Sequence, residues 1–127
     1  MSAPSSCHRP LAAELELTEL PQELQQPALS PQPVRTGAAS LPGTPHLTSG
    51  IWEHSPGVST DVEVEEVFVV VSGTGRIVLL DQPEEPVLEL EVGTVVHLTE
   101  GARTRWEIDE PGLRKVYVMP AAPTASL

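Results

Sequence analysis

The sequence predicts an all-β fold, an antiparallel jelly-roll β-barrel preceded by an irregular N-terminal arm. In the run 66–80 an acidic residue enters a β-branched segment that breaks at Gly73 and then resumes, which is the pattern of a β-hairpin. Twenty residues after Gly73, Gly93 opens a similar strand that Gly101 turns. No long segment has a convincing helical period, whereas short strand-like runs and turns alternate from Val34 onward.

Eight strands are expected in order, each a short run rich in β-branched or aromatic residues. They are predicted at residues 34–39, 46–54, 64–71, 75–80, 87–91, 94–98, 103–109 and 113–119. Turn residues separate them at 55–57, 72–74, 81–86, 93, 100–101 and 109–112. This strand density favours a jelly-roll barrel over an immunoglobulin sandwich, which typically carries a cysteine pair.

Prolines indicate the domain organisation. Residues 1–33 hold six prolines among many Ala, Ser and Gln residues, a composition that does not form long packed elements. We therefore predict a largely irregular arm at 1–33, a single domain at 34–120 that folds without the arm, and a flexible C-terminal tail at 121–127.

Part of the arm, residues 11–24, has two interpretations. Leu15 and Leu17 alternate with acidic residues as in a strand, whereas Leu17, Leu20 and Leu24 recur at helical spacing. We favour an extended segment whose leucines cover apolar sheet, either on its own barrel or on a partner subunit.

The charge balance limits the possible partners. The formal net charge of −11 excludes nucleic acid, whose phosphates require a basic face, and disfavours an anionic membrane surface. No apolar run is long enough for a signal peptide or a bilayer span, so we expect a cytoplasmic protein. Cys7 is the only cysteine, so no intramolecular disulfide can form.

Acidic residues concentrate between residues 53 and 91, where Arg76 is the only lysine or arginine. Several alternate with Val or Leu, as the outward face of a strand would. We interpret most of them as a solvated face, and the pattern leaves a cationic ligand open as the alternative.

Several motifs carry a family resemblance. Glu66 and Gly73 have the spacing E-x6-G, Gly93 and Gly101 have the spacing G-x7-G, and four further segments fit the same family: GIWEHSPG at 50–57, GTVVHLTEG at 93–101, TRWEIDEP at 104–111 and LRKVYVMP at 113–120. Together they resemble the cupins, and among these the ureidoglycine aminohydrolase-like domains. The resemblance implies an RmlC-like jelly-roll barrel over residues 34–120, and it implies a homodimer, because small cupins usually cover sheet edges and apolar outer faces by pairing. It leaves activity open.

The resemblance also makes a prediction about metal. A metal-binding cupin supplies three histidines and a glutamate, but here the glutamate position holds Glu66 while the histidine positions hold Ser59, Asp61 and Thr104. Hydroxyl groups are poor donors for a transition metal, so we expect neither metal nor any other cofactor. If a metal site is rebuilt, its candidate ligands are Glu66, His54, His97 and Asp61. The alternative is that each histidine is hydrogen-bonded at a strand end or exposed.

Strand alternation predicts the wall of the cavity. If Glu66 points inward, Phe68 does too, and if Thr104 points inward, Trp106 follows. A carboxylate among apolar side chains suits acid–base chemistry near neutral pH unless a cation pairs with it. Glu66 is therefore the candidate general base, and the alternative is an exposed acid at the barrel rim. The obvious charge partners are Arg103, Arg105 and Arg114, although alternation places the first two outward.

The remaining candidates for ligand binding share a predicted position near the barrel interior. They are Trp52, His54, Asp61, Phe68, His97, Thr104, Trp106 and Tyr117. Aromatic side chains at a barrel mouth often stack on a ligand. The alternative is that both tryptophans pack the core and that Tyr117 is a packed edge residue.

Three functions remain, and whether the protein is an enzyme stays open. The favoured one is a small-molecule binding protein that holds a small polar metabolite in the barrel without metal. The second is a metal-assisted hydrolase or isomerase related to ureidoglycine aminohydrolase. The third is a structural or partner-binding dimer with a filled barrel.

Overall fold

The structure is a computed structural model that describes residues 4–121. Within these residues it contains ten strands, two short 3-10 helices and no α-helix, so the predicted all-β class is confirmed. The helices are η1 (Pro10–Ala12) and η2 (Gln22–Leu24), and neither is long enough to cross a membrane. The strands are β1 (Thr18–Glu19), β2 (Arg35–Leu41), β3 (Leu47–His54), β4 (Gly57–Val62), β5 (Glu66–Ser72), β6 (Gly75–Leu79), β7 (Val87–Leu90), β8 (Val95–Leu98), β9 (Arg103–Ile108) and β10 (Leu113–Pro120).

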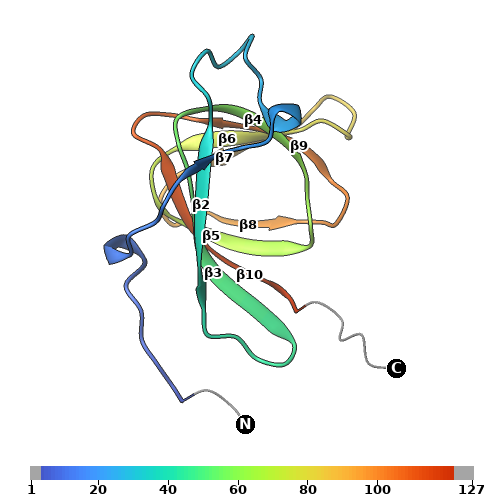
Figure 1. Ribbon diagram of the computed structural model, residues 1–127. Coiled ribbons are helices and arrows are strands. Elements are labelled where there is room, and N and C mark those ends of the chain that lie inside the picture. The colour runs from blue at the N-terminus through green and yellow to red at the C-terminus, as the bar shows by residue number, and fades with distance from the viewer. Residues whose placement is uncertain (1–3, 122–127) are drawn as a thin grey trace.

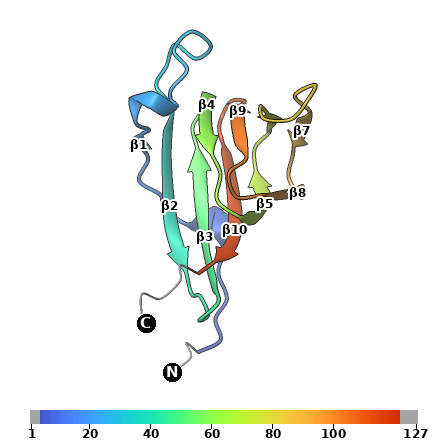
Figure 2. The same cartoon turned by 90° about the vertical axis from the view of Figure 1, so that its right-hand side faces the viewer.

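The strands form two antiparallel sheets that curve around a common interior (Figure 1). The larger sheet has the strand order β1-β2-β3-β10-β5-β8, and the smaller sheet has the order β4-β9-β6-β7. Figure 2 shows β2, β3 and β10 side by side, in a register that places Trp52 between Ala38 and Lys115. The crossover that inserts β10 between β3 and β5 is typical of a jelly roll, as the sequence predicts.

The core lies between the two sheets and follows the predicted alternation. Glu66 and Phe68 on β5 are both buried, and so are Thr104 and Trp106 on β9. The chain turns after β5 at Gly73, as the sequence predicts. Gly73 has φ +90°, and the Gly112 carbonyl oxygen occupies the space that a Cβ would need, so only glycine fits this turn.

One full strand of the barrel, β4, was not predicted. Its sequence GVSTDV mixes Val and Thr with Gly, Ser and Asp, of which Gly and Asp are depleted in strands, and it begins at Gly57, within the expected turn at 55–57. The strand forms because β9 pairs with it over its whole length, from Gly57 opposite Ile108 to Val62 opposite Arg103. Tertiary pairing here overrides the weak local preference.

The N-terminal arm is mostly extended, apart from the one-turn helices η1 and η2, and lies on its own barrel. Gln25 ties it to the start of the domain: its side-chain nitrogen donates to the carbonyls of Leu20 and Val34 at 3.2 and 3.0 Å. Its side-chain oxygen accepts the Val34 amide at 2.9 Å. These bonds satisfy backbone groups that would otherwise be unpaired at the entry to the barrel.

Arg114 fastens the arm at a second place. Its Nη1 donates to the carbonyl oxygens of Pro10 and Ala13, each at 2.7 Å, while its Nε donates to Glu53 at 2.7 Å. The arm then passes so close to β2 that a Cβ on Gly37 would collide with the Glu16 carbonyl oxygen. Arg114 therefore serves the outer face of the sheet, not the cavity.

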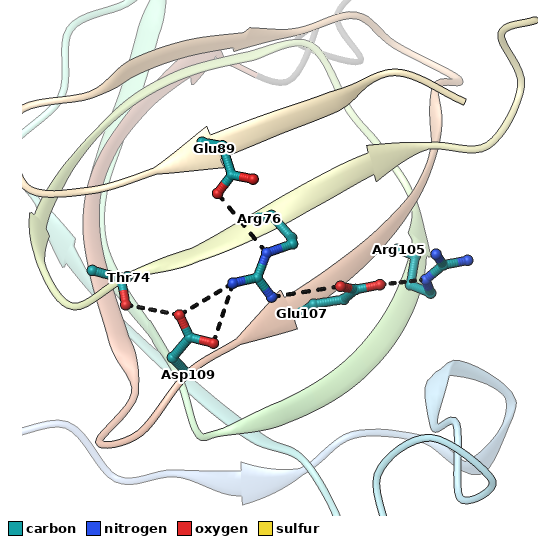
Figure 3. Close-up of polar contacts among 6 residues, drawn as sticks. All are labelled: Thr74, Arg76, Glu89, Arg105, Glu107 and Asp109. Carbon is teal, nitrogen blue, oxygen red and sulfur yellow. Dashed lines mark hydrogen bonds and ion pairs between the residues drawn. The ribbon is translucent and has the colours of Figure 1, made fainter. Parts of the chain in front are cut away.

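The outer face of the smaller sheet carries a charge network centred on Arg76 (Figure 3). The guanidinium lies 3.9 Å from Glu89, 3.5 Å from Glu107 and 3.3 Å from Asp109. Thr74 and Arg105 extend the network by donating to Asp109 and Glu107. Of these acidic residues, Glu89 belongs to the solvated face that the sequence indicates, while Glu107 and Asp109 lie outside it. Ion pairs this exposed contribute little each.

The contact between arm and barrel yields a testable prediction. Gly37→Ala in the full chain should lower the free energy of unfolding by about 1–3 kcal/mol, because the new methyl group displaces the Glu16 backbone. In a chain that begins at Gln32, which should still give the circular dichroism spectrum of a β-barrel, the same substitution should be neutral or slightly stabilising.

Urea unfolding of the four proteins measures both effects. An equal cost of Gly37→Ala in the long and short chains would show that the arm does not dock on β2. An unfolded short chain would instead show that the arm is part of the core, and that the predicted domain boundary is misplaced.

Candidate functional site

A cavity of about 370 Å³ lies between the two sheets. Its walls come from β3, β4, β5, β9 and β10, and the arm completes the rim with Leu20 and Leu24. Most of the wall is apolar or aromatic, but a small group of charged side chains also reaches it. A volume and lining of this kind are typical of small-molecule sites.

A buried ion pair stands at the centre of this wall. Lys115 Nζ on β10 lies 2.7 Å from Glu66 Oε2 on β5, and the two residues are only 4% and 6% exposed. Alternation along β10 directs Lys115 inward and Arg114 outward. The partner of Glu66 is thus a lysine, and the expectation of an arginine partner (Arg103, Arg105 or Arg114) is wrong.

Three aromatic rings surround the lysine ammonium. Lys115 Nζ lies 4.4 Å from the ring centres of Trp52 and Phe68 and 4.8 Å from that of Trp106. Cation–π attraction of this kind strengthens when the cation is desolvated. Burial lowers the pKa of Lys115, and the Glu66 carboxylate is the largest influence that opposes this shift. The rings and the carboxylate together replace the water that the ammonium has lost.

Glu63 is a second buried acid on the cavity wall and is 7% exposed. Its Oε2 accepts two hydrogen bonds, from Thr104 Oγ1 at 2.5 Å and from Trp106 Nε1 at 3.0 Å. Burial raises the pKa of Glu63, and the nearby Asp61 charge adds to this, while the two hydrogen bonds oppose it. Such an acid can exchange a proton nearer neutral pH than an exposed glutamate can.

The sequence placed Glu63 among the solvated acids, and this interpretation is wrong. A signal was present, since Ser59, Asp61 and Glu63 alternate with period two and all three reach the cavity wall. It could be used only if β4 had been recognised as a strand.

His54 is fully enclosed and uses both ring nitrogens. Nδ1 lies 2.5 Å from the Ser55 carbonyl oxygen, and Nε2 lies 2.8 Å from Ser59 Oγ. A carbonyl only accepts, so Nδ1 carries the proton and Nε2 accepts from the serine hydroxyl. Burial lowers the pKa of His54 to about 4, aided by the Lys115 charge and opposed by the bond to Ser55. His54 is therefore neutral at neutral pH.

The other predicted site residues divide between cavity, core and surface. Trp52 and Tyr117 are half-buried and line the cavity, while Phe68 is a fully buried core residue. Burial raises the pKa of Tyr117, and the Glu66 charge adds to this, so its hydroxyl keeps its proton. Asp61 lies at the exposed rim.

His97 does not line the cavity. Its side chain is exposed on the outward face of β8, where Nε2 contacts Glu65 Oε2 at 2.5 Å. This placement corrects the expectation that His97 faces the cavity, because residues that alternate with the buried Val96 and Leu98 point outward.

The residues at the expected metal positions do not fit a transition metal. Ser59 donates to His54, Thr104 donates to Glu63, and Asp61 lies at the exposed rim. The retained glutamate, Glu66, already holds the Lys115 ammonium. Across residues 4–121 no three His, Cys, Asp or Glu side chains gather where they could hold a metal ion. A metal would therefore have to displace a cation and break two hydrogen bonds to find donors.

The enclosure of His54 predicts how stability depends on pH. The unfolded chain protonates His54 as the pH falls below 6.5, whereas the folded chain does so only near pH 4. The free energy of unfolding should therefore fall across this window, by about 3 kcal/mol from this residue. Glu63 changes in the opposite direction, because its raised pKa favours the folded state as the pH falls.

Comparison of variants isolates the histidine. Urea unfolding between pH 7 and pH 4 should show a smaller loss for His54→Gln than for the unsubstituted chain, while His46→Gln, which removes an exposed histidine, should keep the full loss. Equal losses for all three proteins would contradict a neutral, enclosed His54.

Comparison with solved structures shows the same fold in proteins of different kinds. The cupin domain of Schizosaccharomyces pombe Cnp3 aligns with a TM-score of 0.61 and 14% identity, covering 91% of this chain and 74% of that one. Ectoine synthase from P. lautus gives 0.59 and 12%, covering 84% and 70%. The EutQ protein of Clostridium difficile gives 0.58 and 17%, covering 70% of this chain and 64% of that one.

The family assignment comes from the sequence. No curated protein sequence matches this chain. The family model described as a EutQ-like cupin domain matches residues 45–117, which is more than half of the chain and includes every strand from β3 to β9. This chain therefore belongs to the EutQ-like cupin domain family.

Proposed function

We propose that the protein binds a small polar metabolite in the barrel cavity and does so without a resident metal. The observation that carries this proposal is the buried charge on the cavity wall. Glu63, Glu66 and Lys115 are each less than a tenth exposed, yet all three line a cavity of about 370 Å³. Burying charged groups is costly, and a barrel that only had to be filled would be more stable with apolar residues here.

The comparisons support the proposal at the level of the fold. Ectoine synthase, by its name, is an enzyme, and Cnp3 contributes a cupin domain, so the same barrel serves different roles. In the present chain the support is local: a cavity of ligand size, aromatic walls, and a few converging polar groups.

A second candidate is a hydrolase or isomerase related to ureidoglycine aminohydrolase. The observation that favours it is Glu63, whose pKa burial raises beside an accessible cavity. In this version Glu63 replaces Glu66 as the general acid or base, because Glu66 is held by Lys115. In the part of the chain that the structure describes, no three His, Cys, Asp or Glu side chains gather as ligands for the metal-assisted form of this reaction.

A cytoplasmic homodimer remains part of the proposal. The outer face of the larger sheet supports pairing, since Val67, Val95 and Val118 are 45%, 67% and 39% exposed. Register places Val118 beside Val67, and β5 pairs with β8 along the same face. Apolar surface of this kind is often covered by a second copy.

Metal analysis separates the first candidate from a metalloenzyme. Protein purified without an affinity tag should carry well under one equivalent of zinc, iron, manganese, nickel or copper by elemental analysis. Near-stoichiometric metal that is lost in Glu66→Gln would contradict the proposal and place the enzyme first.

A thermal-shift screen of the same samples separates a binding protein from a filled structural barrel. Some small polar metabolites should raise the midpoint of thermal unfolding. A filled structural barrel would show no such ligand.

A further inference from the structure

The charges that face the cavity are unequal in sign. Three carboxyl groups, those of Asp61, Glu63 and Glu66, line it against a single ammonium, that of Lys115, within the part of the chain that the structure describes. His54, the other basic side chain on this wall, has a pKa lowered by burial and is neutral. The Lys115 charge is already matched by Glu66 at 2.7 Å. Two carboxyl groups therefore face the cavity without a cationic partner there.

Two carboxylate oxygens also lack a hydrogen-bond donor. Glu63 Oε2 accepts two bonds and Glu66 Oε2 accepts the lysine, but no described residue donates to the Oε1 atom of either side chain. Among residues 4–121, every side-chain nitrogen or oxygen that is sealed from solvent has a partner. These two oxygens are therefore accessible to solvent, and both residues line the cavity. A carboxylate in a site this buried is best satisfied by a charged donor.

The same arrangement of charges disfavours an anionic ligand. The one ammonium in the wall is enclosed by Glu66 and by three ring faces at 4.4 to 4.8 Å, so a ligand anion cannot reach it without displacing Glu66. On the way it would also pass the free oxygens of the acidic side chains, and like charges at close range disfavour binding.

We propose that the cavity selects a small organic cation, whose N–H groups donate to Glu63 Oε1 and Glu66 Oε1. This inference deepens the proposed function and rests on it. The apolar rim, formed by Leu20, Leu24, Val62 and Met119, covers the body of the ligand. The site thus combines charged acceptors at depth with an apolar mouth, which suits an aliphatic amine or amidine in place of a sugar or an acid.

The two tryptophans provide the measurement. Trp52 and Trp106 are the only tryptophans in the chain and both line the cavity, so fluorescence and the two indole N–H resonances report on it alone. We would titrate four probes of similar size: butylammonium, butanol, butyrate and tetramethylammonium, the last a cation without N–H donors. Butylammonium should bind in the millimolar range expected of a fragment, at least about tenfold tighter than the other three.

Matched variants test the residues. Glu63→Gln keeps an oxygen that can accept from Thr104 and Trp106 but removes the charge, and it should weaken butylammonium binding at least about tenfold. Glu91→Gln makes the same change on an exposed strand end and should leave binding unchanged. Circular dichroism and the unfolding midpoint of each variant establish that it is folded.

The outcomes separate this inference from the proposed function. Tighter binding of butyrate or butanol, or an unchanged affinity in folded Glu63→Gln, would overturn the inference of a cation site while keeping the barrel as a binding site. Equal binding of tetramethylammonium would overturn the donation of N–H groups to Glu63 Oε1 and Glu66 Oε1 that the inference requires. If no probe and no polar metabolite in the screen perturbs either tryptophan, the proposed function fails as well.

Discussion

The ion pair of Lys115 and Glu66 inside a ring of aromatic side chains is the interaction on which the interior of this barrel depends. Two charges less than a tenth exposed lose most of their hydration, and the attraction across 2.7 Å offsets that loss only if the remaining surroundings also favour charge. Trp52, Phe68 and Trp106 supply those surroundings for the ammonium. The few aromatic residues of the chain are therefore concentrated where the desolvated cation needs them.

The same arrangement explains the state of the neighbouring polar groups. The ring of Trp106 faces the Lys115 ammonium, and its indole N–H donates to Glu63. Trp106 therefore connects Glu63 to the ion pair of Lys115 and Glu66. The Lys115 charge also helps to keep His54 neutral, so this histidine serves as a hydrogen-bond bridge to Ser59 and not as a metal ligand. In this barrel a lysine ammonium supplies positive charge beside Glu66.

Much of the fold follows from the sequence because a buried strand must alternate. Parity alone put Glu66 on the same strand face as Phe68, and Thr104 on the same face as Trp106, and the structure buries all four. Parity failed where the strand itself was not recognised. β4 has a mixed composition and forms by pairing with β9, so Glu63 was assigned to the surface. Lys115 was missed as the partner of Glu66 because pairing across β5 and β10 depends on a register that includes an irregularity at this residue.

The most direct test of the account is a double-mutant cycle on the buried pair, with Glu66→Gln and Lys115→Met as volume-conserving substitutions and the free energy of unfolding as the quantity measured. A buried pair should give a coupling energy of at least about 2 kcal/mol, because each single variant leaves an uncompensated buried charge while the double variant leaves none. A coupling energy below about 0.5 kcal/mol, the range of exposed ion pairs, would show that the two side chains do not form a buried pair.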